Sequence, residues 1–303
     1  MTAIELRGVS RWYGNVVAVN DITMTIGPGV TGLLGPNGAG KTTILHMIAG
    51  FLMPSRGEIT VAGGSSWRNP NMFRRVGVVP ERDSVYAFLT GAEFVRSSAK
   101  LHGLPDPDAA ARRSIGLLEM TEAQDRKIST YSKGMRQRIK VAAALVHDPE
   151  IVLLDEPFNG MDPRQRLHMM DLLHAAGEQG RVIVFSSHIH EEVERLSGII
   201  QVIVGGRLAA SGDFRAIRRL MTNRPHVFLV RSSDDRALGA ALIGRPAVSA
   251  VELTTHGLQV RASDYGTFTR EVAGISRDHG IRLTQVQPAD ESLESVFTYL
   301  LAS

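Results

Sequence analysis

The 303-residue sequence has no cysteine, no apolar run long enough to cross a bilayer and no arginine-rich arm. Without cysteine there can be no disulfide and no thiolate metal site, which fits a cytosolic protein. The longest apolar stretches, such as "GIIQVIVG" at 198–205, fall short of the roughly 20 residues that a transmembrane helix needs. The formal charge of +3 is small and its basic residues are dispersed, so we expect no nucleic-acid partner. The N-terminal segment lacks the apolar stretch of a signal peptide.

Short apolar strands alternate with helical segments along the chain. This order predicts an α/β fold in which helices cover a mostly parallel sheet. The runs "VTGLLG" (30–35), "EIVLLDEP" (150–157) and "RVIVFSSH" (181–188) are typical of buried strands. In the first third, "IELRGV" and "DITMTI" alternate apolar and polar residues, which also indicates strands.

Two domains are expected, 1–222 and 226–303, because the turn-rich "TNRP" at 222–225 is typical of a linker. Within the first, about 85–147 is mainly helical and is expected to be an inserted subdomain. The second follows the order strand, helix, two strands, helix, strand, helix, which predicts a small α+β domain with a split β-α-β arrangement. Long helices are expected at 91–120, broken at 103–107, at 132–146 and at 164–180.

The stretch "GPNGAGKTT", Gly35 to Thr43, matches the pattern G-x-x-x-x-G-K-[ST] between a predicted strand and a predicted helix. Glycines let a tight loop turn its backbone N–H groups toward an anion, and the helix N-terminus adds partial positive charge. Lys41 is expected to reach the β- and γ-phosphates of ATP, Thr42 to ligate Mg²⁺ and Thr43 to contact the α-phosphate. The expected ATP-binding residues of the loop are Gly35, Asn37, Gly38, Gly40, Lys41, Thr42 and Thr43.

Two carboxylates, Asp155 and Glu156, end the buried strand "IVLLDEP". In open α/β sheets, ligands bind at this carboxyl edge. We expect Asp155 to hold Mg²⁺ and Glu156 to act as the general base that polarises the attacking water.

A third motif, "YSKGMRQR", runs from Tyr131 to Arg138, shortly before that strand. Ser132 suits a helix N-cap, and Gly134 would let the backbone approach a phosphate. With this motif the sequence resembles the ATP-binding subunit of an ABC transporter. The resemblance implies a P-loop NTPase core with an antiparallel β subdomain and a helical insert, joined here to the small C-terminal α+β domain.

The resemblance also implies roles for further residues. Tyr13 matches the aromatic that stacks on adenine, and His188 matches the switch histidine that contacts the γ-phosphate as part of the catalytic site. Ser132 and Gly134 would contact ATP on an opposing subunit, since family members sandwich two ATP molecules between two chains. Asp162 matches the loop that communicates across that dimer; by itself it would be a helix N-cap before a proline.

The sequence departs from the family pattern at three positions. Lys133 and Met135 replace the usual glycine and glutamine of the signature, and Glu81 replaces a glutamine that contacts Mg²⁺ and the membrane partner. Glu81 can still ligate Mg²⁺ but adds negative charge near a polyphosphate. These variants, with "ESLESVF" at 291–297, resemble the subfamily that works with ABC-2 type export permeases.

We therefore expect an ATPase subunit that dimerises on ATP, as a homodimer, and drives a separate transmembrane permease, with ATP and Mg²⁺ as cofactors. It would be cytoplasmic and peripheral on the inner face of the cell membrane. One alternative is a non-hydrolysing regulatory subunit, which the three departures leave open and the intact Lys41, Asp155, Glu156 and His188 argue against. Another is an ABC-type ATPase unconnected with transport. The cargo, and the pairing of like or unlike chains, stay open.

Overall fold

The computed structural model describes residues 3–82, 84–220, 225–289, 293–294 and 297–298, and the chain falls into two compact units, residues 1–211 and 212–303. The division lies upstream of the linker expected at 222–225, which except for Pro225 falls outside the described residues. The predicted domain limits at 222 and 226 stay a prediction. Among the described residues, no helix has the length and apolar character to span a membrane.

The first unit contains an antiparallel sheet of strand order β2-β1-β4-β5. Its strands are β1 (Ile4–Tyr13), β2 (Val16–Ile26), β4 (Arg56–Val61) and β5 (Gly64–Ser65). Their alternation buries one face, because side chains such as Leu6, Ile22 and Ile59 point into the core. This sheet is the predicted antiparallel β subdomain.

The central sheet has six strands in the order β10-β9-β3-β8-β7-β6. They are β3 (Gly29–Leu34), β6 (Val76–Val79), β7 (Ile151–Asp155), β8 (Val182–Ser187), β9 (Ile199–Val204) and β10 (Arg207–Asp213). From β9 to β6 every neighbouring pair is parallel. Because β3, β8 and β7 are neighbours, their carboxyl ends bring Leu34, Ser187 and Asp155 to one edge.

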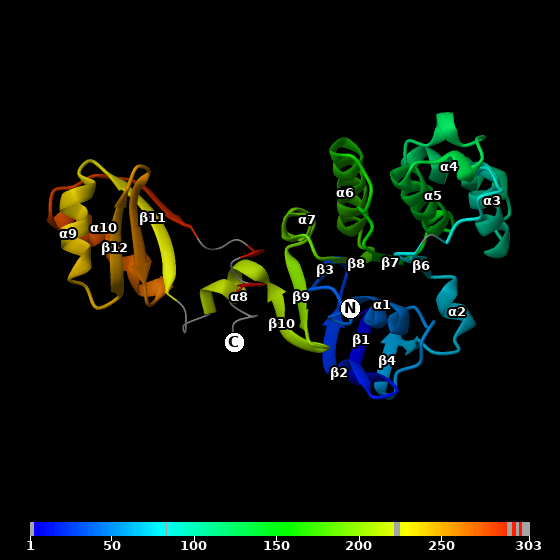
Figure 1. The fold of residues 1–303 in the computed structure, drawn as a ribbon, viewed down its shortest axis with the longest axis horizontal. Helices are drawn as coiled ribbons and strands as arrows, with labels where there is room; N and C mark the ends of the chain where they lie inside the picture. The colour runs from blue at the N-terminus through cyan, green and yellow to red at the C-terminus, as the bar shows by residue number, and fades with distance from the viewer. Residues whose placement is uncertain (1–2, 83, 221–224, 290–292, 295–296, 299–303) are drawn as a thin grey trace. The chain divides into compact units, whose positions relative to one another are not determined.

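Helices cover both faces of the central sheet. Helix α1 (Lys41–Ile48) lies between the two sheets, within a single core built from both of them. Helices α6 (Pro163–Glu178) and α7 (His190–Leu196) pack against β3 and β8 on the opposite face (Figure 1). The sequence did not indicate α7, which has only seven residues and follows His188 closely.

The predicted insert is helical, as Figure 1 shows. Its helices are α3 (Gly91–Leu101), α4 (Pro107–Leu117) and α5 (Lys133–Leu145), preceded by the short α2 (Pro70–Phe73). The break at 103–107 is confirmed: Asp106 caps α4 by accepting a hydrogen bond from the Ala109 N–H at 2.8 Å, and Pro107 occupies its first turn.

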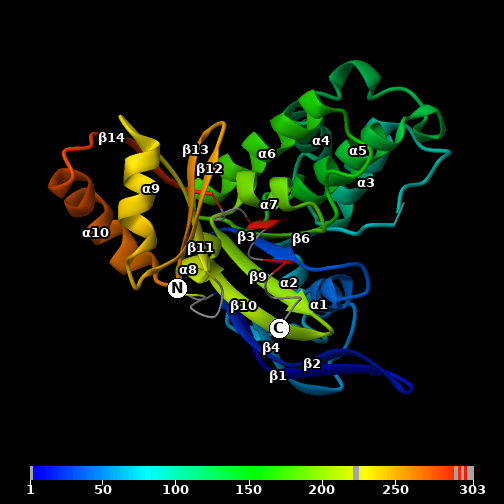
Figure 2. The same cartoon turned by 60° about the vertical axis from the view of Figure 1, so that its left-hand side comes forward.

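The second unit begins with α8 (Phe214–Leu220) and contains an antiparallel sheet of order β12-β13-β11-β14. Its elements are β11 (His226–Ser232), α9 (Asp235–Ile243), β12 (Val248–Thr254), β13 (Gly257–Ala262), α10 (Tyr265–Asp278) and β14 (Leu283–Pro288). Both α9 and α10 lie on one side of this sheet (Figure 2). The element order up to β14 is the predicted one, and most of the helix expected at 291–297 lies outside the described residues.

Candidate functional site

The loop between β3 and α1 can be built only with glycine at two positions. A Cβ on Gly35 would lie 2.3 Å from the carbonyl oxygen of Ile203. A Cβ on Gly40 would lie 2.5 Å from the carbonyl oxygen of Ala18, and Gly40 also has a φ of +104°. These close approaches hold the loop against neighbouring strands, so that it leads directly into the N-terminus of α1.

Lys41 opens α1, and 6% of its surface is exposed. Its Nζ donates hydrogen bonds to the carbonyl oxygens of Gly35 (2.7 Å) and Pro36 (3.2 Å). Burial lowers the pKa of the Lys41 ammonium, although the negative charges of Glu156, Asp155 and Glu81 act in the opposite direction. An anion in the loop would favour the charged form of the ammonium.

Beside this loop lies a cavity of about 380 Å³, here called the phosphate pocket. One side is the glycine loop and the start of α1; the other carries three carboxylate side chains. Its lining residues are Ala18, Asn37, Gly38, Ala39, Gly40, Lys41, Thr42, Thr43, Glu81, Asp155 and Glu156. Backbone and lysine donors thus face carboxylates across a space suited to a polyphosphate with a divalent cation.

Asp155 ends β7 with 3% of its surface exposed. Its Oδ1 accepts a hydrogen bond from Ser186 Oγ at 2.5 Å, and the same hydroxyl accepts from the Glu156 N–H at 2.9 Å. The second oxygen, Oδ2, is buried without a hydrogen-bond partner among the described residues. A buried carboxylate oxygen in that condition fits a hard cation or a water of its shell.

Glu156 follows at the strand end, 8% exposed and with a φ of +48°. Both of its carboxylate oxygens lie 3.0 Å from His188 Nδ1. Burial raises the pKa of Glu156, while the His188 contact and the charge of Lys41 lower it. A carboxylate whose pKa moves toward neutrality is suited to accept a proton.

Two of the sequence-predicted residues do not line the phosphate pocket but contact residues that do. Gly35 accepts the hydrogen bond from Lys41, and His188 contacts Glu156, so each touches a residue that does line the pocket. Tyr13 is also outside the lining, 46% exposed, with the Arg11 guanidinium 4.9 Å from its ring centroid.

The signature residues and Asp162 do not line the phosphate pocket of their own chain either. Ser132 Oγ caps α5 by accepting from the Met135 N–H at 3.2 Å, and Asp162 Oδ1 caps α6 by accepting from the Gln165 N–H at 2.9 Å. Both therefore have a local structural role as helix caps. Gly134 lies in the first turn of α5.

Gly134 is constrained by a contact inside the chain. A Cβ at this position would lie 2.7 Å from the carbonyl oxygen of Gly160, in the loop that ends at Asp162. Glycine therefore lets the first turn of α5 lie against that loop, which is a reason for glycine in addition to the phosphate approach expected from the sequence.

Sequence reasoning missed three polar residues that support the site. Ser186 bridges Asp155 and the Glu156 backbone, as described above. Glu192, 5% exposed, accepts from Ser187 Oγ at 2.7 Å just before His188. Lys140 donates to the loop that contains Glu81. The available signal was a polar residue inside an otherwise buried run; the partners, far away in sequence, could not be identified from it.

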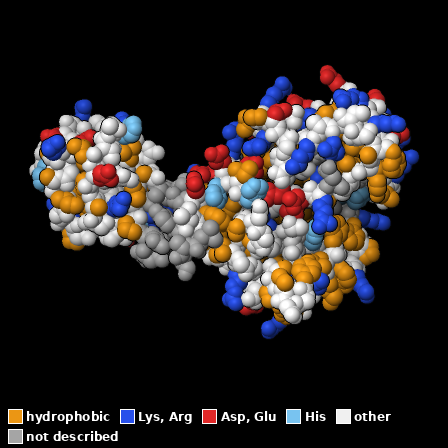
Figure 3. Space-filling model, viewed as in Figure 1, with side chains coloured by type: hydrophobic (Ala, Val, Ile, Leu, Met, Phe, Trp, Pro, Cys, Tyr) orange, Lys and Arg blue, Asp and Glu red, His pale blue; other side chains and the backbone are white. Residues whose placement is uncertain are grey.

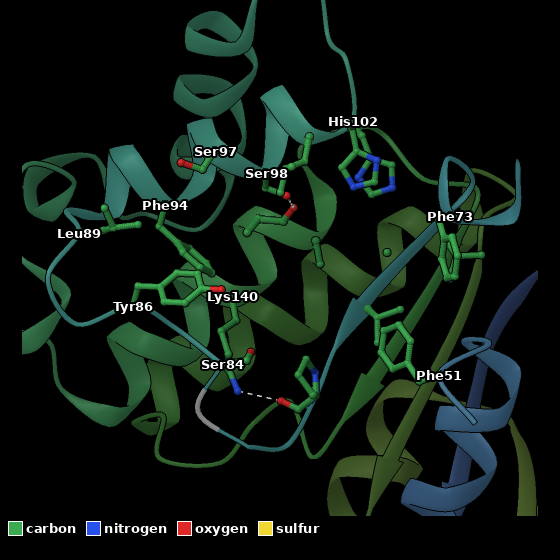
Figure 4. Close-up of a pocket in the computed structure, with 18 of the residues that line it drawn as sticks. Phe51, Phe73, Ser84, Tyr86, Leu89, Phe94, Ser97, Ser98, His102 and Lys140 are labelled. Atoms are coloured by element: carbon green, nitrogen blue, oxygen red, sulfur yellow. Dashed lines mark hydrogen bonds between the residues drawn. The ribbon is translucent and has the colours of Figure 1, made fainter. Parts of the chain in front are cut away.

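A second hollow, about 520 Å³ and called here the apolar groove, lies between the helical insert and the core (Figure 4). Several of its aromatic and aliphatic side chains are exposed, with Phe88 at 73% and Leu101 at 89%. Hydrophobic side chains gather over α2 and α3, to the right of Figure 3, whereas acidic and basic ones are interspersed elsewhere on that face. The residues that line the groove include Phe51, Phe73, Pro80, Tyr86, Phe88, Phe94, Leu101, His102, Lys140, Ala143, Ala144 and His147.

Two histidines stack in the wall of the groove. The rings of His102 and His147 have centroids 3.6 Å apart and lie 6° from parallel. Burial lowers the pKa of His147 to about 4 and also lowers the pKa of His102. Both imidazoles are thus neutral at physiological pH, and this wall carries no charge from them.

Comparison with known proteins agrees with this site. The sequence model of the family described as "ABC transporter" matches residues 19–159. The chain is 30% identical over 306 residues to the linearmycin resistance ATP-binding protein of Bacillus subtilis, covering 98% of this chain and 97% of the relative. It is 39% identical over 218 residues to the Nod factor export ATP-binding protein I of Cupriavidus pinatubonensis, covering 70% and 67%.

A solved structure shows the same fold. A dimeric bacterial ABC transporter cassette matches with a TM-score of 0.65 at 22% identity, covering 69% of this chain and 98% of that one. The glycine loop, the carboxylates at the strand end and the match along nearly the whole length of a curated relative agree: the chain belongs to the ATP-binding proteins of the ABC transporter family.

Proposed function

We propose that this chain is an ATP-hydrolysing subunit that dimerises on ATP and powers a separate export permease. The observation that carries the proposal is the phosphate pocket, where a glycine loop and Lys41 face Asp155 and Glu156. Donors for a polyphosphate, an oxygen site for a cation and a candidate base meet there in one cavity. Residues 226–303 are proposed to be an accessory domain.

The pocket residues divide the binding of Mg²⁺-ATP among them. The Lys41 ammonium, which now donates to carbonyl oxygens of the loop, would donate to the β- and γ-phosphates instead. The N–H groups of Gly38, Gly40 and Thr43 would face the other phosphate oxygens. Thr42 Oγ1, Asp155 Oδ2 and the Glu81 carboxylate would hold Mg²⁺, the three residues that the sequence predicts as ligands. When bound, Mg²⁺ supplies positive charge that offsets the charge of the β- and γ-phosphates.

Glu156 is proposed as the general base. Its carboxylate would accept a proton from the attacking water, and His188, 3.0 Å away, would keep that carboxylate oriented and partly offset the cost of its charge. The Ser186 hydroxyl accepts from the Glu156 N–H and donates to Asp155 Oδ1. These two hydrogen bonds would keep the proposed base and the proposed cation ligand at a fixed distance from each other.

A second chain is proposed to complete the site. Ser132 and Gly134 begin α5, where helix N–H groups favour an anion, yet neither lines the pocket of its own chain. Each chain carries one phosphate pocket and one such helix start, so two identical chains arranged head to tail would complete both sites. The dimeric cassette with the same fold supports this arrangement. Asp162, next to the Gly134 contact, would lie at that interface.

The membrane partner is proposed to be a permease of the ABC-2 type, with this subunit on the cytoplasmic face. The apolar groove is its proposed docking site, because exposed side chains such as Phe88 and Leu101 would be covered by a partner helix. The relative named for Nod factor export supports an export direction.

The test is ATP turnover by the purified chain, with Glu156→Gln and a matched exposed variant, Glu150→Gln. Glu156→Gln should lose at least about a hundredfold in kcat, as expected for a general base, and keep ATP binding. Glu150→Gln should turn over normally, since Glu150 pairs with Arg75 at the surface. Lys41→Ala should lose ATP binding itself. If Glu156→Gln turns over ATP at the wild-type rate, the catalytic assignment is wrong.

A further inference from the structure

Lys140 is a charged side chain buried in the middle of α5, with 3% of its surface exposed. Its Nζ donates hydrogen bonds to the backbone carbonyls of Pro80 (2.8 Å), Arg82 (3.2 Å) and Glu81 (3.4 Å). The three carbonyls match the three N–H donors of an ammonium group. Burying a charge is costly unless such partners compensate for lost hydration, so this position ties α5 firmly to residues 80–82.

The segment 80–82 lies between the two hollows of the first unit. Glu81 lines the phosphate pocket, and its negative charge acts on Lys41 there, whereas Pro80 and Lys140 line the apolar groove. Figure 4 shows the Lys140 side chain running from α5 to the carbonyl oxygen of Pro80. Lys140 therefore contacts the backbone of Glu81, the residue of this segment that lines the phosphate pocket among those that the structure describes.

The groove wall formed by α5 is a single helical stripe. Lys140, Ala143 and Ala144 follow the spacing i, i+3, i+4, which places them on one face of α5, and His147 lines the groove just beyond the end of the helix. Ser98 Oγ donates to the Ala143 carbonyl at 3.0 Å and attaches this stripe to α3. The N-terminus of the same helix carries Ser132, so α5 links the groove, the Glu81 segment and the proposed dimer contact.

We propose that Lys140 is a positioning residue that holds Glu81 toward the phosphate pocket. The inference rests on the proposed function, in which Glu81 faces Mg²⁺-ATP. Loss of the Lys140 ammonium would release the three carbonyls and, with them, the position of the Glu81 carboxylate.

The first test is hydrogen–deuterium exchange of the full chain without nucleotide, read at the peptide that contains 79–82. Lys140→Met removes the charge at similar volume, and Lys140→Gln keeps donors without charge. Lys100→Met, on the exposed end of α3, is the control. Whichever Lys140 variant folds should exchange about tenfold faster at this peptide, while Lys140→Arg and the control exchange like the wild type. Unchanged exchange in the folded variant would overturn the proposal.

The second test is a double-mutant cycle with Glu81→Gln, read as the Mg²⁺ concentration that gives half-maximal ATP turnover. Lys140→Met should raise this concentration several-fold in the wild-type background and leave it unchanged in the Glu81→Gln background, because both residues act through one carboxylate. Additive effects would contradict a role through Glu81. Exchange needs no turnover, so an inactive wild type would refute the proposed ATPase while the exchange result still decides the role of Lys140.

Discussion

Lys41 and Glu156 both line the phosphate pocket, and burial moves their pKa values in opposite directions. It lowers the pKa of the lysine and raises that of the glutamate, because in each case the charged form loses hydration. Each charge partly offsets the effect of burial on the other group, because the charge of Lys41 lowers the pKa of Glu156 and the charge of Glu156 raises the pKa of Lys41. The phosphate pocket thus holds two charges that burial makes costly in folding free energy, a common condition of functional sites.

This cost predicts a pH-dependent effect of Glu156→Gln on stability. Because the folded-state pKa is raised above the ordinary 4.5, the wild-type chain loses stability at Glu156 as pH rises through the folded value. Glutamine cannot ionise, so the variant should have the larger free energy of unfolding at pH 7, by about 1.4 kcal/mol for every tenfold difference in proton affinity between the folded and unfolded chain. The gain should shrink toward zero as pH falls to 4.5.

The measurement is urea denaturation of both proteins from about pH 4.5, the ordinary value for a glutamate, upward to about pH 8. Glu150→Gln is the opposite control, because the hydrogen bond from Arg75 lowers the pKa of Glu150. That variant should gain no stability at neutral pH. A Glu156→Gln variant that is less stable than the wild type at pH 7 would show that its contacts with His188 outweigh burial.

At the scale of elements, α5 joins most of the features described above. Ser132 caps its start, Gly134 lets its first turn approach the Gly160 loop, and Lys140 holds the segment 80–82. Ala143 and Ala144, near its far end, line the apolar groove. One helix therefore lines the apolar groove, holds the segment that contains Glu81 and carries the proposed dimer contact at its start.

The packing of α5 predicts opposite effects for two glycine-to-alanine changes. Gly134→Ala places a Cβ 2.7 Å from the Gly160 carbonyl oxygen and should destabilise the chain by about 1–3 kcal/mol through overpacking. Gly116→Ala, in α4 with nothing within 4 Å, should stabilise it by about 0.5–1 kcal/mol through helix propensity. Urea denaturation midpoints of the two variants measure both effects. Equal effects of the two changes would mean that Gly134 is not packed against the loop.

The elements that the sequence predicted are those specified by local patterns. The glycine loop, the buried strands before Gly35 and Asp155, the α5 start at Ser132 and the break before Pro107 depend on nearby residues alone. The links between them could not be predicted, because Lys140 reaches Pro80 across sixty residues and Ser186 reaches Asp155 across thirty-one. Such partners depend on strand order, which no local pattern contains. Helix α7 was missed because it is short.

At the scale of the whole molecule, each proposed ATP site needs a phosphate pocket from one chain and the start of α5 from a second chain. The phosphate pocket lies at the carboxyl edge of the central sheet, and the Ser132 end of α5 does not line it. A signature that serves a second chain would explain why the start of α5, a proposed phosphate contact, does not line the pocket of its own chain. ATP would then act as the contact between two chains, and its hydrolysis would release them.

The most direct test is the molar mass in solution of the Glu156→Gln variant with ATP and Mg²⁺, by light scattering after size exclusion. The account predicts a dimer, twice the 32.9 kDa chain, that returns to the monomer when Mg²⁺ is chelated and that does not form when Ser132→Arg is added. A Glu156→Gln chain that binds ATP and stays at 32.9 kDa would contradict the central claim that two chains complete each other's sites.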